Sequence, residues 1–207
     1  MRARKLTTEV RRDQIARAAL QLIAARGVRG LSLETLAKKV GIVPSGIYRH
    51  FRGREEVLDA TLEHLGARLH HNLDLVAAET EDPLERIHRL LIRHVRLIRE
   101  NQAIPRIIFS EEVYGRHSAR KARVRAIIGR YLEGVAGFVR EGQAAGRIRR
   151  DLDARAAAVA FLGLFQPAAI LWHLSDGDFP VTRQTEQAWR IYRAGIEKRP
   201  APRRVAP

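Results

Sequence analysis

Residues 33–51 read LETLAKKVGIVPSGIYRHF, and this stretch decides the fold. Its spacing predicts a helix that ends near Val40, a tight turn and a second short helix. A small residue such as Ala37 lets two helices cross closely, Gly41 takes a positive φ without a Cβ penalty, and Pro44 suits a first helical position. The positions expected to face inward are Leu36, Ala37, Val40 and Ile47. The pattern indicates a helix-turn-helix whose exposed face is suited to lie on DNA.

The chain resembles the tetracycline-repressor (TetR) family of bacterial transcriptional regulators. The resemblance rests on LSLETLAKKVGIVPSGIYRHF (residues 31–51), REEVL (residues 54–58) and AARGVRGLS (residues 24–32), and it covers roughly residues 8–65. The remainder is similar to the family in length and helical character. The resemblance implies an all-α fold of about nine helices, with an N-terminal three-helix helix-turn-helix domain and a larger helical domain for ligand binding and dimerisation.

Helical periodicity extends over almost the whole chain. An apolar stripe that Thr7 or Thr8 can cap and Gly27 can end predicts the first helix. Later apolar stripes predict helices around residues 58–76, 84–98, 107–114, 124–138, 154–174 and 189–196. We expect a DNA-binding domain at residues 1–53, an effector-binding and dimerisation domain at 54–197, and a disordered basic tail at 198–207.

Residues 154–174 are apolar on nearly every side, and Pro167 is expected to kink this helix. A helix of this kind must be buried on two sides. A central position in a monomer would explain the pattern as well as pairing with a second copy. The resemblance favours a homodimer through the last two helices, and its two-fold symmetry would imply a pseudo-palindromic DNA site.

Composition narrows the class of protein. The chain of 207 residues is 45% hydrophobic, which is typical of a globular protein, and it contains no cysteine. Disulfides, thiolate metal sites and cysteine nucleophiles are therefore excluded. We expect no apolar run long enough to span a membrane, and no apolar core follows the charged N-terminus as in a signal peptide. These features predict a cytoplasmic protein without a membrane partner.

The formal net charge is +15, which suits a polyanionic partner such as DNA. Residues 1–60 carry 13 Lys and Arg against 6 Asp and Glu, and the other 147 residues carry 25 against 17. The excess of positive charge is denser in the N-terminal 60 residues but is not confined to them. A nonspecific DNA-binding protein, with steep salt dependence and no preferred sequence, is therefore an alternative hypothesis.

Contacts to DNA phosphates position a protein without reading sequence. The resemblance implies such contacts for Tyr48, His50 and Arg54, and the hydroxyls of Ser32 and Thr35 are suited to the same task. Phe51 is expected in the core.

Base reading is expected from the exposed positions of the second short helix, which are Val43, Pro44, Ser45, Gly46 and Arg49. Arg49 can grip guanine O6 and N7 with two hydrogen bonds, and Ser45 can donate or accept. Val43 stands where family members often carry a capping Ser or Thr, at a cost of about 1 kcal/mol. We therefore hypothesise that Val43 packs on a thymine methyl group. With so few base readers, DNA shape should contribute to specificity.

The resemblance also implies a small-molecule pocket in the later helices. The expected lining is largely apolar, with His and Glu side chains to orient a ligand. The apolar and aromatic candidates are Leu62, Leu65, Leu91, Ile107, Phe109, Tyr131, Phe161, Phe165 and Trp172. The polar candidates are His64, His88, His94, His173, Glu111 and Glu112. Such a pocket favours an apolar or aromatic effector. Binding of the effector would move the fourth helix and change the spacing of the two recognition helices, which is ~34 Å when they fit DNA, so the repressor would leave its operator.

Other function classes are less well supported. No nucleophile motif, phosphate-binding loop or dinucleotide fingerprint is present, and no cofactor is implied, so an enzyme is not expected. Glu111, Glu112 and His117 could group, which leaves a metal-sensing regulator of the same fold as an alternative. A repressor whose pocket is filled by its own side chains also remains open.

Overall fold

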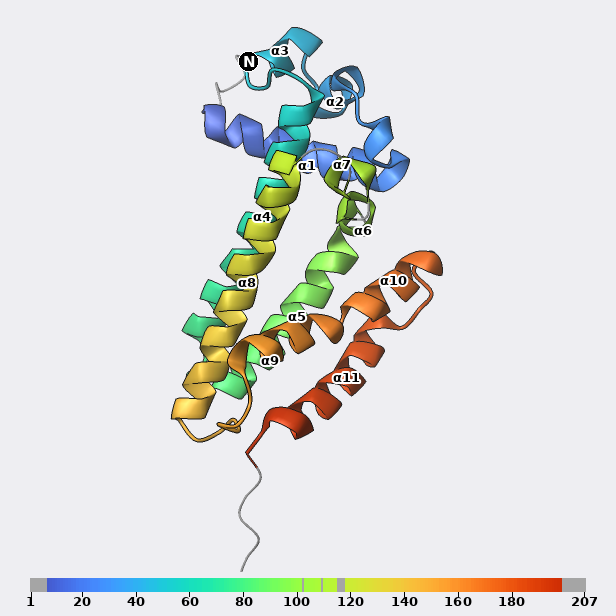
Figure 1. Cartoon of the computed structure of the whole chain (residues 1–207). Coiled ribbons are helices and arrows are strands. Elements are labelled where there is room, and N and C mark those ends of the chain that lie inside the picture. Colours follow the sequence, from blue (N-terminus) through green and yellow to red (C-terminus); the bar gives the residue numbers. More distant parts are fainter. Residues whose placement is uncertain (1–6, 102, 109, 115–117, 199–207) are drawn as a thin grey trace, which may run out of the picture. The chain divides into compact units, whose positions relative to one another are not determined.

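The computed structural model describes residues 7–101, 103–108, 110–114 and 118–198 (Figure 1). The helices among them are α1 (Thr8–Arg26), α2 (Leu33–Val40), α3 (Pro44–Tyr48), α4 (Arg54–Glu79), α5 (Pro83–Glu100), α6 (Ala103–Ile108), α7 (Glu111–Tyr114), α8 (Ser118–Ala144), α9 (Ala154–Gly163), α10 (Gln166–Leu174) and α11 (Val181–Ile196), with a 3-10 helix at Val28–Gly30. The expected all-α class is confirmed. Phe109, His117 and residues 199–207 of the expected tail lie outside the described residues.

The chain divides into two compact units. The first comprises residues 1–71 and 96–129, and the second comprises residues 72–95 and 130–207. α4, α5 and α8 each run from one unit into the other. The first unit extends past residue 53 because α4 and α6 contribute side chains to the same core as α1. The expected division into DNA-binding and effector-binding residues stays a prediction.

The first unit is built on the local signals that the sequence carries. α1 buries its apolar stripe, and the Thr7 hydroxyl accepts a hydrogen bond from the backbone of Val10 at 3.4 Å. α2 begins at a reciprocal cap between Ser32 and Thr35 and ends at Gly41, whose φ of 75° and ψ of 36° are left-handed. Capping therefore fixes both ends of α2, the first helix of the helix-turn-helix.

The expectation of one short helix over residues 107–114 is wrong. α6 begins at Ala103, and α7 follows as a separate turn at Glu111. Pro105 is the third residue of α6, where a backbone N–H has no partner within the helix, so proline is tolerated there rather than breaking the helix. Between the two helices the Ser110 hydroxyl donates to the Ile107 carbonyl at 2.8 Å, and this local bond competes with helix continuation.

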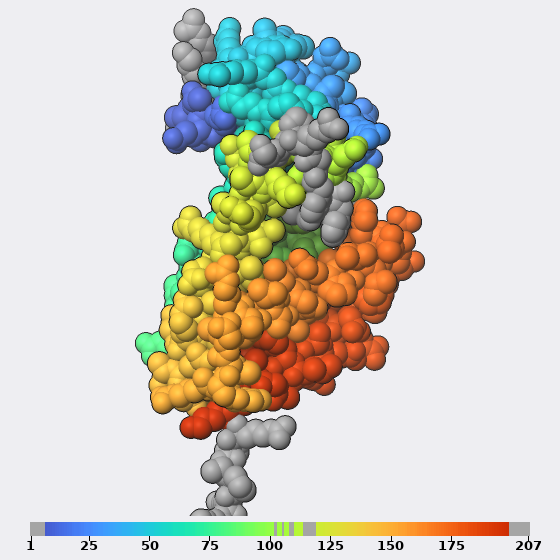
Figure 2. All heavy atoms as spheres, viewed as in Figure 1, coloured from blue at the N-terminus to red at the C-terminus, as the bar shows by residue number. Residues whose placement is uncertain are grey.

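In the second unit the expected kink at Pro167 is a full break. α9 ends at Gly163 and α10 begins at Gln166. A proline ring clashes with the carbonyl four residues earlier, which here belongs to Gly163. The surfaces of α10 (orange) and α11 (red) adjoin in Figure 2, and the two helices pack against each other.

The expectation that no apolar run is long enough to span a membrane is also wrong, because one run is long and apolar enough by length and composition. Within residues 154–174, an 18-residue window has a mean hydropathy of 1.6, the run is long enough to cross a membrane, and 39% of that window is buried inside the structure. The break divides the run into helices of 10 and 9 residues, each about 15 Å long. Neither alone matches a hydrocarbon core of about 30 Å.

Candidate nucleic-acid interface

α3 presents a short outward face. Its buried residue is Ile47, whereas Val43 is 67% exposed and Tyr48 60% exposed. Ser45 and Arg49 are exposed as well. The Val43 side chain makes no capping hydrogen bond, as expected for an apolar residue in this position. The residues expected to read bases therefore share one accessible end of the first unit.

Gly46 lies in this face and is not demanded by the fold. A Cβ atom at this position would lie 3.4 Å from Cδ1 of Ile42, which is an ordinary van der Waals separation. The absence of a side chain leaves the backbone of α3 open to close approach by another molecule.

The end of α3 is held by Arg12, a residue that the sequence pattern did not single out. Nη1 of Arg12 donates a hydrogen bond to the carbonyl oxygen of His50. The same guanidinium lies 4.2 Å from the centre of the Phe51 ring and 3.1 Å from Oε1 of Glu56. The Glu56 carboxylate also accepts the backbone N–H of Arg52, and this bond, with the pairing to Arg12, lowers its pKa.

His50 is half-buried, and its Nδ1 atom is enclosed without a hydrogen-bond partner among the described residues. Buried polar atoms are nearly always paired, so this unpaired Nδ1 atom is an exception. Phe51 is buried, as expected.

The other expected phosphate contacts are already engaged within the protein. The hydroxyls of Ser32 and Thr35 lie 2.9 Å apart and complete the α2 cap. Arg54 donates to the carbonyls of Val28 at 2.8 Å and Leu31 at 3.0 Å. A DNA contact by Arg54 would have to compete with these bonds.

Further salt bridges connect Arg54 to α7 and α8. Its guanidinium lies 3.3 Å from Glu112 and 2.7 Å from Glu55. Arg120, which is 5% exposed, binds Glu55 at 2.7 Å and Asp59 at 2.8 Å. This network ties the start of α4 to α7 and α8 within the first unit.

The expected ligand-lining residues are distributed over both units. Leu62, Leu65 and Ile107 belong to the apolar core of the first unit, together with side chains of α1, α2 and α3. Glu111 is exposed and pairs with Arg29 at 3.2 Å. These four residues are therefore placed as core and surface residues of the first unit.

The second unit gathers the aromatic candidates. The ring of His94 lies 3.8 Å from that of Phe165, and its Nδ1 atom lies 3.1 Å from the Tyr131 hydroxyl. Removal from water lowers the pKa of His94 to about 3 and raises that of Tyr131. Leu91 and Trp172 are buried in the same unit.

His88 also lies in the second unit, apart from the residues that contact His94. Its ring stacks on Trp189 at 4.9 Å, and its Nε2 atom lies 3.1 Å from Glu186. Within the part of the chain that the structure describes, no three His, Asp or Glu side chains are arranged to hold a metal ion.

Comparison with known proteins gives two family matches. Residues 15–61 match the family described as bacterial regulatory proteins, tetR family. Residues 80–196 match the family described as tetracyclin repressor-like, C-terminal domain. Together the two matches cover both the helix-turn-helix and most of the remaining helices.

Individual relatives are distant in sequence but align over most of the chain. The chain is 20% identical over 186 residues to the "Fatty acid metabolism regulator protein" of Bacillus subtilis, which covers 90% of this chain and 95% of that one. It is 23% identical over 189 residues to the "Nucleoid occlusion factor SlmA" of Vibrio atlanticus, with 90% and 96% covered.

Solved structures share the fold. The fatty acid degradation regulator FadR from Bacillus halodurans matches with a TM-score of 0.77 and 20% identity, covering 95% of this chain and all of that one. FadR from Bacillus subtilis, solved in complex with stearoyl-CoA, matches with a TM-score of 0.74 and 20% identity, covering 88% and 98%.

Proposed function

The chain belongs to the TetR family of bacterial regulatory proteins, and on that premise we propose that it is a homodimeric repressor of transcription that binds a pseudo-palindromic operator. The neighbours are transcriptional regulators, not enzymes, and this protein is a DNA-binding regulator of the same kind. We further propose that it acts in the cytoplasm and is released from DNA by a small, largely apolar effector.

The exposed face of α3 is the observation that carries sequence-specific binding. Arg49 is the exposed side chain of this face that can bind guanine with two hydrogen bonds, and Ser45 and Val43 lie beside it. Tyr48 is accessible for a phosphate contact. We assign Arg54 to positioning, because its guanidinium holds two backbone carbonyls of the helix-turn-helix.

Dimerisation is supported by apolar side chains that the second unit leaves exposed. Those of α9, α10 and α11 are Val159, Ile170, Leu171, Leu174 and Ile191, and Ile92 of α5 is exposed as well. Exposed apolar residues gathered on neighbouring helices mark an interaction surface, and a two-fold axis buries the same surface of both copies.

The aromatic cluster of the second unit supports an apolar effector. His94, Tyr131 and Phe165 offer ring faces and one hydrogen-bonding pair, which is the usual lining of a small-molecule site. The Bacillus subtilis regulator carries stearoyl-CoA, a ligand with a long apolar chain. Binding would favour a state in which α4 is displaced and the two recognition helices no longer match successive major grooves.

The test is to sequence genomic DNA fragments captured by the purified protein at near-physiological salt. Arg49→Ala is run in parallel, with Arg130→Ala as a control that removes an exposed arginine of α8 in the second unit. A palindromic motif that Arg49→Ala loses or relaxes, and Arg130→Ala keeps, is the expected result.

A featureless set of fragments, equally weakened by both substitutions, would overturn this function. Binding would then follow the net charge of +15 rather than α3, as expected of a nonspecific DNA-binding protein.

A further inference from the structure

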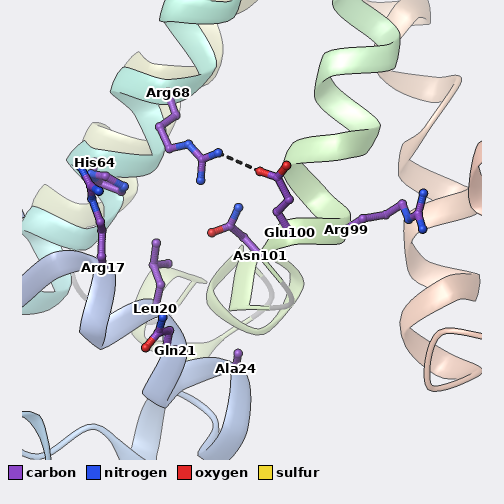
Figure 3. A pocket seen from close by; sticks show the side chains of 9 residues that line it. All are labelled: Arg17, Leu20, Gln21, Ala24, His64, Arg68, Arg99, Glu100 and Asn101. Carbon is purple, nitrogen blue, oxygen red and sulfur yellow. Dashed lines mark hydrogen bonds and ion pairs between the residues drawn. The ribbon is translucent and has the colours of Figure 1, made fainter. Parts of the chain in front are cut away.

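A polar cavity of about 660 Å³ lies within the first unit, apart from the aromatic cluster proposed for the effector. Three segments line it: α1, α4 and the end of α5 (Figure 3). The lining residues are Arg17, Leu20, Gln21, Ala24, His64, Arg68, Arg99, Glu100 and Asn101. The volume is within the usual range for small-molecule sites, and the lining is far more polar than is usual for them.

The geometry follows from helical spacing. The four α1 residues are spaced i, i+3, i+4 and i+7, so they form one stripe, and His64 and Arg68 lie one turn apart on α4. Leu20 closes the cavity toward the apolar core, of which it is a member. Figure 3 shows Arg68 and Asn101 directed into the space between the helices, whereas Arg99 points away from it.

The lining carries three arginines against one glutamate. Arg68 pairs with Glu100 at 3.0 Å, and Arg17 pairs with Asp13 at 2.5 Å. His64 also lies 2.6 Å from Asp13. Arg17 and Arg68 are therefore each paired with a carboxylate of the protein.

These pairs are easily exchanged. The side chains of both Arg68–Glu100 and Arg17–Asp13 are exposed, and exposed ion pairs contribute little to stability. A guanidinium binds phosphate or carboxylate oxygens in a two-pronged geometry, so an incoming anion can replace Glu100 at Arg68 at small cost. The amides of Gln21 and Asn101 offer further polar contacts.

We propose that this cavity binds a small polyanion bearing phosphate or carboxylate groups, held between Arg17 of α1 and Arg68 of α4. The anion displaces Glu100 from Arg68. The bound anion therefore links α1, which packs against α2, to α4, which follows the helix-turn-helix. The site is independent of the proposed operator binding, because its ligand is recognised by residues outside the α3 face.

The experiment is calorimetric titration of the full chain with inorganic pyrophosphate, and separately with citrate, at fixed ionic strength. Arg68→Gln is expected to weaken binding about tenfold and Arg17→Gln several-fold. Glu100→Gln is expected to tighten it several-fold, because it removes the carboxylate that competes for Arg68. Arg130→Gln, in the other unit, is the matched control and keeps the wild-type affinity.

Comparison of the affinities for pyrophosphate and citrate distinguishes a phosphate site from a carboxylate site. Saturable binding of either anion, weakened by Arg68→Gln, supports the proposal. Absence of saturable binding by both would overturn it. So would an equal loss of affinity in Arg68→Gln and Arg130→Gln, which would indicate general attraction to a basic protein. Thermal unfolding of each variant without anion shows that it is folded, and DNA capture by the wild type reports on the operator function separately.

Discussion

Arg12 in α1 donates a hydrogen bond to the carbonyl oxygen of His50, 38 positions later in the chain. Its guanidinium also covers the Phe51 ring and pairs with Glu56 at the start of α4. One side chain therefore links the C-terminal end of α3 to α1 and to the start of α4. We therefore expect the orientation of Tyr48 and Arg49 to depend on this bond, although Arg12 itself is not placed among the base readers.

Arg12→Ala should lower both DNA affinity and stability. Loss of a charged hydrogen bond costs about 2 kcal/mol of unfolding free energy, and loosening of α3 should reduce operator affinity about tenfold. Denaturant unfolding and fluorescence anisotropy with operator DNA measure the two effects, with Arg130→Ala as the control. Unchanged affinity in a destabilised Arg12→Ala variant would show that α3 keeps its orientation without this anchor.

Val43→Ser tests the unusual start of α3. A serine hydroxyl can accept an N–H of the first turn that Val43 leaves unpaired, so the variant should be about 1 kcal/mol more stable. If Val43 packs on a thymine methyl group, the same variant should lose preference for thymine at one position of the operator. Stability is read by denaturant unfolding and preference by selection from randomised DNA; gained stability with unaltered preference would refute the thymine contact.

Gly46→Ala tests whether glycine at this position serves folding or DNA binding. The added Cβ meets Ile42 at an ordinary distance, and alanine favours a helix by up to about 1 kcal/mol, so stability should not fall. We expect operator affinity to fall severalfold, because DNA that approaches the α3 backbone closely would meet the added methyl group beside Ile42. Retention of full affinity in anisotropy measurements would mean that DNA does not approach this part of α3.

The helix-turn-helix could be predicted from sequence because its signals are local. The left-handed Gly41 and the N-terminal Pro44 each act within one helical turn, and the structure has both where the spacing predicts them. The same local reasoning placed the start of the next short helix at Ile107 instead of Ala103, because a proline in a first turn and a proline that breaks a helix look alike in sequence.

The arrangement of distant residues could not be predicted in this way. Nothing in the spacing links Arg12 to His50, or Arg17 to Arg68, because helix packing rather than periodicity brings them together. Apolar spacing marked Leu62 and Ile107 as inward without showing that they face the core of the first unit rather than a pocket. Whether the expected ligand residues bind one effector stays a prediction.

His94 should make stability depend on pH. Its pKa is lowered to about 3 in the folded chain from 6.5, so below pH 6.5 the unfolded chain takes up a proton that the folded chain does not. The contribution of His94 to the free energy of unfolding is therefore fully present above pH 6.5. It is lost as the pH falls, by at most about 1.4 kcal/mol per pH unit, and by less because part of the residue reaches solvent.

The measurement is denaturant unfolding between pH 6.5 and 5, above the range in which most carboxylates titrate. His94→Gln keeps a polar group near Tyr131 but does not titrate, and it should flatten the pH dependence. His71→Gln, which removes an exposed histidine of α4, is the control. An equal slope in wild type and His94→Gln would assign the pH dependence to other groups.

Leu174 and Ile191 should decide the oligomeric state. They are 73% and 77% exposed on α10 and α11, so replacing them with glutamate costs a single chain little. At a two-fold interface the same substitutions would bury unpaired carboxylates from both copies, at a cost of several kcal/mol. In sedimentation experiments the wild type should therefore be a dimer, and Leu174→Glu with Ile191→Glu a folded monomer. Val10→Glu, at an exposed apolar residue of α1, should remain dimeric. The monomer should also bind the operator more weakly, because the two half-sites are no longer bound together. A variant that stays dimeric with both charges would place the interface on another surface.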